Sequence, residues 1–194
     1  FSSVPSQHAG EGALNAIFRM GSVFCYLDRA EKPLCATANA LADVPSIHRI
    51  FAFFSKLGDG TAWVLLVITI GLFRPDARNL PVVLIGASII NLGLYKLVKG
   101  QMVRNRPCMT WEAITSREPP LDTYSFPCGH TLHAVTITLI ILPVLPLLGM
   151  VLVPVTVMIM LSRIVLGLHY PTDVVVATLL GSFVASYAGD LVSL

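Results

Sequence analysis

The stretch 162–173 combines residues that can do chemistry: Ser-Arg-Ile-Val-Leu-Gly-Leu-His-Tyr-Pro-Thr-Asp. It lies between two long apolar segments, although an Arg or Asp at the centre of a membrane helix costs about 2.5–3.5 kcal/mol. His169 and Asp173 are four residues apart, and Pro171 suits the first turn of a helix. The carboxylate can therefore bind one imidazole nitrogen, leaving the other as a nucleophile or base toward an anion held by Arg163. Taken alone, the stretch also fits, less well, a juxtamembrane loop whose charges face water.

A second polar group borders the loop 99–130. The loop opens with Lys99 and Arg106, seven residues apart, and closes with the run Pro-Cys-Gly-His that ends at His130. With Arg163 these make three permanent cations, which require an anionic partner, and phosphate fits best. Gly129 allows close backbone approach at a helix start, where free N–H groups favour an oxyanion. His130 would supply a general acid beside the nucleophile.

The composition indicates whether these residues belong to a soluble or a membrane protein. Of 194 residues, 55% are hydrophobic and 12% charged, with a mean hydropathy of +0.75. Soluble domains average about 25% charged residues, so we expect an integral membrane protein forming one compact domain. A net charge of +2 without a basic run argues against nucleic acid as a partner.

The apolar segments predict how the polar residues are positioned. We expect an all-α, polytopic membrane bundle of about five to six helices, with at most five spans, at 61–73, 80–98, 131–148, 149–166 and 172–192. Because successive spans alternate in direction, the ends that carry Lys99, His130, Arg163 and His169 must share one membrane face. The active site is therefore predicted at that face.

The N-terminal third is less apolar. Residues 11–27 predict an interfacial helix or a first span, 28–32 a charged break ended by Pro33, and 34–58 a second amphipathic region. We therefore expect residues 1–58 to form N-terminal amphipathic helices and residues 59–194 to form the catalytic transmembrane core.

The three polar pieces are Lys-(six residues)-Arg-Pro, Pro-x-Gly-His and Ser-Arg-(five residues)-His-(three residues)-Asp, in that order. Together they resemble the signature of the type-2 phosphatidic acid phosphatase superfamily, over roughly residues 55–190. One such motif would be weak, whereas three in register are specific. The resemblance implies a membrane phosphatase that hydrolyses a lipid phosphate or diphosphate.

The resemblance also implies roles for individual residues. Lys99, Arg106 and Arg163 would hold the phosphate oxygens. Gly129 would donate its N–H to one of them, and Ser162 would hydrogen-bond nearby.

The catalytic roles carried over by the resemblance fall on three residues. His169 would attack phosphorus and form a phosphohistidine, with Asp173 fixing its tautomer. His130 would protonate the leaving group and then activate water. No metal or other cofactor is expected.

Cys128 departs from the family pattern, which usually has serine at this position. A thiol donates more weakly than a hydroxyl, and a lost donor to an oxyanion costs up to about 10²–10³ in rate. A cysteine-phosphatase mechanism needs an arginine six positions on, where Ala134 stands. Free thiols are the default for all four cysteines, with a Cys108–Cys128 disulfide as the alternative.

Other polar residues are predicted to be structural. Asp59, between two glycines, suits a turn or helix cap. His133 could line the pocket, but an interfacial position with its hydrogen bonds satisfied fits better. Arg104 could assist the phosphate, but it lies off the motif and fits the headgroup level better.

Several points stay open from the sequence. The substrate could be undecaprenyl diphosphate, phosphatidic acid, phosphatidylglycerol phosphate or lipid A. A lipid phosphotransferase, or a binding or transport module weakened by Cys128, would use the same residues. Arg74 and Arg78 favour a cytoplasmic turn, and hence a site facing the periplasm of a bacterial inner membrane, whereas the basic loop 99–117 favours the reverse. No protein partner is inferable.

Overall fold

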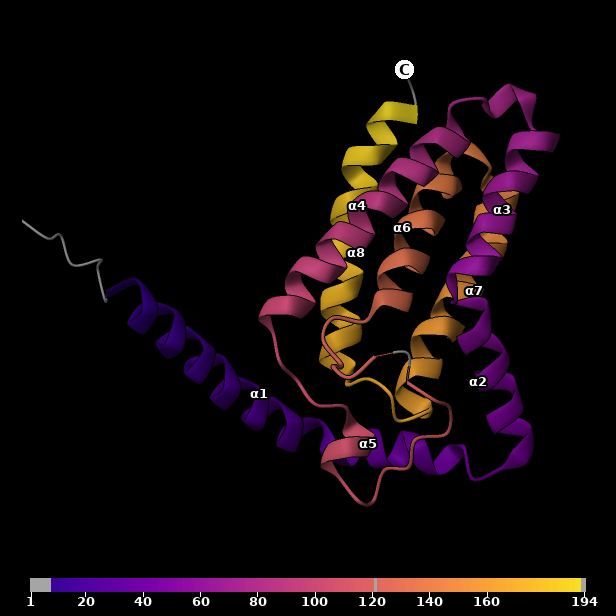
Figure 1. Ribbon diagram of the computed structural model, residues 1–194. Coiled ribbons are helices and arrows are strands. Elements are labelled where there is room, and N and C mark those ends of the chain that lie inside the picture. Colours follow the sequence, from indigo (N-terminus) through magenta and orange to yellow (C-terminus); the bar gives the residue numbers. More distant parts are fainter. Residues whose placement is uncertain (1–7, 121, 193–194) are drawn as a thin grey trace, which may run out of the picture.

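The computed structural model describes residues 8–120 and 122–192, and within these ranges the regular structure is entirely helical. The helices are α1 (His8–Leu41), α2 (Pro45–Leu57), α3 (Gly60–Phe73), α4 (Leu80–Gln101), α5 (Pro107–Thr110), α6 (Gly129–Val144), α7 (Pro146–Val165) and α8 (Pro171–Val192), with a 3₁₀ turn at Pro75–Ala77 (Figure 1). The predicted all-α architecture is confirmed.

Three helices are long and apolar enough to cross a membrane: α4, α7 and α8 over Pro171–Gly189. A fourth span is possible if α2 and α3, which meet at a bend of 57°, count as one broken span. The chain is therefore an integral membrane protein, with three or four candidate spans among the described residues.

Helix α6 is apolar but only 16 residues long, and it stands among α4, α7 and α8 (Figure 1). Leu132 and Ile137 are fully buried on it. Its buried hydroxyls are also satisfied: Thr136 Oγ1 donates to the carbonyls of Leu132 at 2.9 Å and Gly181 at 3.1 Å. A helix that is apolar on most of its surface belongs in the interior. The buried α6 therefore fixes the positions of Gly129 and His130 at its N-terminus.

The predicted break at 28–32 is wrong, because α1 continues without interruption through Pro33. Two residues of the charged run, Asp28 and Glu31, bind the buried Arg104 at 2.8 Å each. Paired charges do not need to leave a helix, so a charged run marked a contact face and not a loop. The C-terminal part of α1 passes beneath one end of the bundle, beside α5 (Figure 1).

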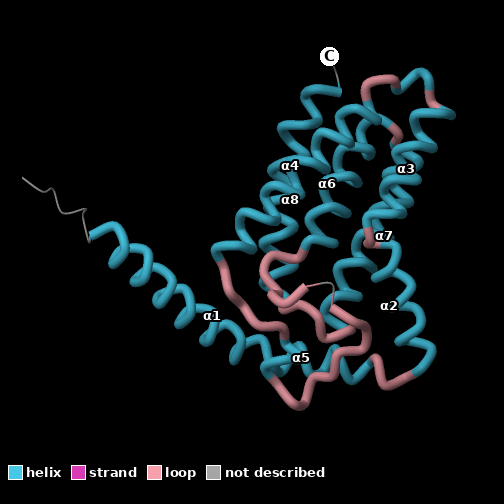
Figure 2. Tube along the Cα trace, in the orientation of Figure 1, coloured by secondary structure: helices cyan, strands magenta, loops and turns pink. Residues whose placement is uncertain are grey.

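The end of α4, the start of α6, the end of α7 and the start of α8 all lie at this same end of the bundle. The long loop 102–128 folds over them (Figure 2). The predicted convergence of these four helix ends is therefore present in the structure.

Candidate active site

His169 is held in a tight buried turn between α7 and α8. The backbone N–H groups of Leu168 and His169 both donate to the carbonyl of Arg163, at 3.1 and 3.0 Å. Gly167 has φ +74°, and a Cβ at this position would lie 2.9 Å from the carbonyl oxygen of Thr115. This left-handed conformation favours glycine, so the turn fixes His169 relative to Arg163.

The two nitrogens of His169 have different neighbours. Nδ1 lies 3.5 Å from Asp173 Oδ2, and Nε2 lies 3.3 Å from Arg106 Nη1. Because a guanidinium can only donate, Nε2 must be the acceptor, and the proton of the neutral ring sits on Nδ1 facing Asp173. The lone pair of Nε2 is thereby directed toward the site, as a nucleophile requires.

A buried ion network lies behind Asp173. Arg104 is 1% exposed and donates to Asp173 Oδ1 at 2.5 Å, to Asp28 Oδ1 at 2.9 Å and to Glu31 Oε2 at 2.8 Å. Its guanidinium carbon also lies 4.0 Å from the centroid of the Tyr170 ring. Arg104 is therefore enclosed by protein, where it orients the carboxylate that faces His169. The sequence signal for this contact is the pair Asp28 and Glu31, three residues apart on α1, which place two carboxylates on the same side of a helix.

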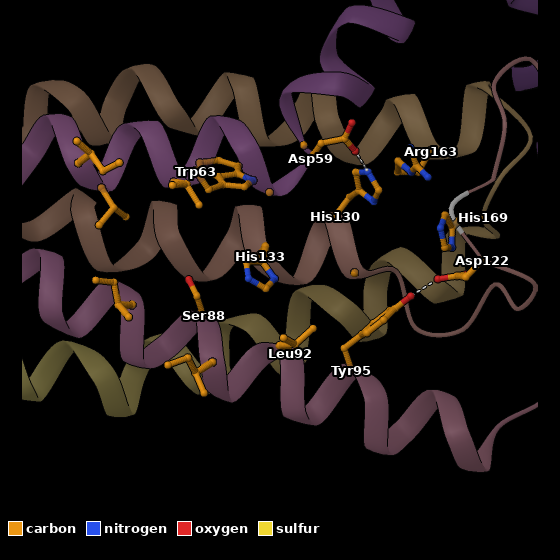
Figure 3. Close-up of a pocket in the computed structure, with 18 of the residues that line it drawn as sticks. Asp59, Trp63, Ser88, Leu92, Tyr95, Asp122, His130, His133, Arg163 and His169 are labelled. Carbon is orange, nitrogen blue, oxygen red and sulfur yellow. Dashed lines mark hydrogen bonds and ion pairs between the residues drawn. The ribbon is translucent and has the colours of Figure 1, made fainter.

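His130 has a carboxylate partner of its own. Its Nε2 lies 2.9 Å from Asp59 Oδ1, at the bend between α2 and α3 (Figure 3). The close approach depends on Gly58, since a Cβ there would lie 2.8 Å from His130 Cδ2. Asp59 does occupy the N-cap position of α3, as predicted, but its side chain makes no cap hydrogen bond. The prediction missed its contact with His130, which is 71 residues away.

Two of the three predicted cations share one carboxylate. Asp122 binds Lys99 Nζ at 2.5 Å through Oδ2 and Arg106 Nη2 at 2.6 Å through Oδ1, and it also accepts a hydrogen bond from the Tyr95 hydroxyl. Burial raises the pKa of Asp122, but the hydrogen bonds and charges of these neighbours outweigh it and hold the pKa below its usual value. The sequence analysis did not identify Asp122, which thus occupies an anion-binding position.

Arg163 is the third cation, and it is 3% exposed. Its Nη1 donates to the Ser55 hydroxyl, while its Nε has no hydrogen-bond partner. Within the described residues no carboxylate forms an ion pair with it. Its charge is therefore available to an added anion.

These groups line one end of a cavity of about 700 Å³. The rest of its wall is mainly apolar and comes from α3 and α4 (Figure 3). Five apolar residues of this wall are exposed on the outside of the bundle: Val64, Ile68, Ile85, Ile89 and Leu92. The polar end therefore continues into an apolar groove that faces the position of the bilayer.

Most predicted site residues meet at this cavity. Gly129, His130, Arg106, Arg163 and His169 line it, while Lys99 and Asp173 each bind a lining residue directly.

The structure does not bring Ser162 into the lining, because its buried hydroxyl donates to the Ile159 carbonyl at 2.6 Å. His133, predicted to be satisfied at the interface, instead lines the cavity and makes no side-chain hydrogen bond to the described residues.

Cys128 is fully buried directly behind the site and accepts a hydrogen bond from Thr131 Oγ1 at 3.3 Å. Burial raises the pKa of its thiol, but the nearby charges of His169 and Arg163 outweigh burial and lower it to about 6. Conversely, burial lowers the pKa of His169, while Cys128 and Asp173 raise it, and the net direction is upward. All four cysteines are free thiols.

Within the described part of the chain, no group of three or more His, Cys, Asp or Glu side chains is arranged to hold a metal ion. The site offers instead three cations, two imidazoles and the N-terminus of α6. Those are the components of phosphate binding and histidine-based group transfer.

Comparison with known proteins agrees with this chemistry. The sequence profile of the PAP2 superfamily matches residues 76–189, more than half of the chain. Undecaprenyl-diphosphatase of Sulfolobus acidocaldarius is 27% identical over 73% of this chain and 69% of its own. Decaprenylphosphoryl-5-phosphoribose phosphatase of Mycobacterium tuberculosis is 30% identical over 79% and 85%.

Two solved structures share the architecture. LpxE of Aquifex aeolicus superposes with a TM-score of 0.70 at 27% identity, over 80% of this chain and 92% of that one. A transmembrane PAP2-type phosphatidylglycerolphosphate phosphatase of Bacillus subtilis superposes with a TM-score of 0.65 at 20% identity, over 89% and 94%, which establishes likeness of fold. The chain therefore belongs to the PAP2 superfamily and is an integral-membrane phosphatase.

Proposed function

We propose that this chain hydrolyses a lipid phosphate or diphosphate at the membrane surface through a phosphohistidine intermediate on His169. The observation that carries the proposal is that two imidazoles and two buried arginines line the same cavity, at the mouth of an apolar groove. A phosphorylated lipid has this same division into an anionic head and a hydrocarbon tail. The named relatives act on undecaprenyl diphosphate and a decaprenylphosphoryl sugar phosphate, and their names support this substrate class.

In the first step, Nε2 of His169 attacks phosphorus, and the bond between phosphorus and the lipid oxygen breaks. The proton on Nδ1 stays toward Asp173, which stabilises the positive charge that forms on the ring. His130 gives its proton to the departing oxygen, while Asp59 holds the other side of its ring.

In the second step, His130 takes a proton from water, and the water oxygen attacks the phosphohistidine. The phosphorus–nitrogen bond breaks, inorganic phosphate leaves and His169 returns to its starting state. The same histidine thus serves as acid and then as base, which requires that its proton be exchangeable.

Phosphate binding requires a rearrangement at Asp122. Its carboxylate neutralises Lys99 and Arg106 in the structure, so we propose that the incoming phosphate displaces it. A dianionic phosphate offers more acceptor oxygens than a carboxylate and can also engage Arg163. The cradle would then bind the head group with all three cations.

The test is release of inorganic phosphate from a panel of lipid phosphates and diphosphates in detergent containing EDTA. We expect wild-type release, loss in His169→Ala, and wild-type release in Val82→Ala, which alters an exposed residue on α4. Acid-labile radiolabel on the protein would identify the phosphohistidine. Full activity of His169→Ala would refute the mechanism, and label recovered in a second lipid would identify a phosphotransferase.

We further propose that the site faces the periplasm of a bacterial inner membrane. Arg74 and Arg78 lie in the turn between α3 and α4, at the opposite end of these helices from the site, and basic turns favour the cytoplasm. A membrane-impermeant thiol reagent applied to intact cells tests this with Ser116→Cys in a background lacking the four native cysteines. If the reagent labels Arg78→Cys and not Ser116→Cys, the site faces the cytoplasm and the proposed orientation is wrong.

A further inference from the structure

Three polar side chains lie deeper in the cavity, among its apolar walls. They are Trp63 of α3, Ser88 of α4 and His133 of α6. Trp63 is 6% exposed, and its indole Nε1 is buried without any hydrogen-bond partner. Ser88 and His133 likewise make no side-chain hydrogen bond to the described residues.

Figure 3 shows these three residues at a similar depth, farther from Arg163 and His169 than His130 is. His133 follows His130 by three residues on the same helix, close to one turn, and a full turn rises about 5.4 Å. The three side chains thus form a second polar level, roughly one helical turn deeper than the groups that would bind phosphate.

The unpaired indole N–H of Trp63 is buried, which costs about 1–3 kcal/mol. Ser88 and His133 are half-buried along the same apolar groove, so this polar level indicates a ligand that pairs with its donors. The indole N–H can only donate, and the hydroxyl and the imidazole can each donate one hydrogen bond as well. The charged residues in the cavity lining are Asp59, Arg106, Asp122 and Arg163, all at the phosphate end. A neutral acceptor oxygen is therefore the matching chemistry.

We propose that Trp63, Ser88 and His133 form a subsite for the ester carbonyl of an acylated lipid phosphate. This inference rests on the proposed function and narrows its substrate class. An acylated lipid places ester carbonyls a few bonds from its phosphate, whereas a polyprenyl phosphate continues directly as hydrocarbon. The subsite consequently favours acylated lipids over polyprenyl phosphates. The carbonyl can belong to a glycerolipid or to an acylated sugar, which share this chemistry.

The test compares kcat/KM for two lipid phosphates of equal chain length, one with ester links and one with ether links that lack the carbonyl. We expect wild type to prefer the ester by about tenfold, the equivalent of one hydrogen bond of 1.4 kcal/mol. Trp63→Phe and His133→Leu should bring the ratio close to one by slowing the ester alone. Val67→Ala, which trims an apolar part of the same wall, should leave the ratio unchanged.

Two further substrates complete the series. A polyprenyl phosphate should react like the ether lipid, and a glucosamine-based acylated phosphate compared with the glycerolipid distinguishes the two sources of carbonyl. A wild-type ratio of one, or a tenfold preference that survives in both variants, would overturn the subsite while leaving the phosphatase activity intact. Absence of phosphate release from every lipid would overturn the proposed function and the subsite with it.

A binding measurement covers the case in which a variant is unstable. The chain has two tryptophans, so His169→Ala combined with Trp111→Phe reports on Trp63 alone without turnover. The emission of Trp63 should shift to longer wavelength when the ester lipid binds and not when the ether lipid binds. Equal spectra with the two lipids would contradict a hydrogen bond to the indole.

Discussion

The two histidines of the site each face an aspartate, but the two pairs are built differently. In the His169–Asp173 pair the side chains are 3% and 0% exposed, and Arg104 ties the carboxylate to α1. In the His130–Asp59 pair they are 10% and 45% exposed. The first pair is enclosed by protein, whereas the second lies at a helix bend and is partly open to the cavity.

This difference matches the two chemical tasks proposed for these histidines. A nucleophile must keep one tautomer and one direction, which a buried and braced carboxylate provides. A general acid that becomes a base must exchange its proton with the leaving oxygen and then with water, which requires access. The comparison predicts that the enclosed pair tolerates substitution far less than the open pair.

The largest effect is expected from removing the proposed nucleophile. His169→Ala should lower kcat by about 10⁵-fold or more, because no other group can form the covalent intermediate. His130→Ala should cost about 10²–10⁴, the usual contribution of a general acid–base. Phosphate release under saturating substrate measures both, and equal losses would remove the distinction between the two imidazoles.

Asp173→Asn should lower kcat by about 10⁴, as for a buried aspartate that fixes a histidine tautomer. An amide can donate to Nδ1 and so place the proton on Nε2, the atom that must attack. The KM should change little, since Asp173 is fully buried and does not line the cavity. A large increase in KM with unchanged kcat would argue for a role in binding instead.

Arg104→Gln should destabilise the fold by about 3–5 kcal/mol, because it leaves the buried Asp173 and the half-buried Asp28 and Glu31 without their cation. Chemical denaturation in detergent measures this free energy of unfolding. Arg49→Gln is the matched control, since Arg49 is exposed and binds only a backbone carbonyl. Equal stability of the two variants would show that the network does not brace Asp173.

Asp59→Asn should lower kcat by about tenfold, less than the 10²–10⁴ expected for loss of the whole general acid–base. The side chain can still accept a hydrogen bond from His130 through its amide oxygen, so much of the orientation survives. Asp76→Asn, at the opposite end of α3 and exposed, is the control. A loss as large as that of Asp173→Asn would make the two pairs equivalent.

The smallest effect concerns pH. The Cys128 sulfur contributes to the raised pKa of His169, and attack requires the unprotonated ring, so activity should fall as the pH drops through this raised pKa. Cys128→Ser removes the acidic thiol, lowers the pKa of His169 and should move the acidic limb of kcat/KM to lower pH. An unmoved limb would show that the thiol is uncharged.

Much of the site could be predicted from sequence spacing alone. Apolar segments of span length alternate in direction, so Lys99, His130, Arg163 and His169 had to share one membrane face. His169 and Asp173 are four residues apart, and α8 begins between them at Pro171, so their side chains lie close together. These relations are local or follow from bilayer geometry, and they do not depend on the details of packing.

Tertiary structure alone decided the partners that complete the site. Asp59 between glycines has the local pattern of a turn, and nothing nearby indicates His130, 71 residues along the chain. Arg104 meets Asp28 and Asp173 across 76 and 69 residues, and Asp122 meets Lys99 only because the long loop folds back over α4. A buried charge is stable only beside its partner, and which partner it meets is set by the packing of helices that sequence periodicity does not specify.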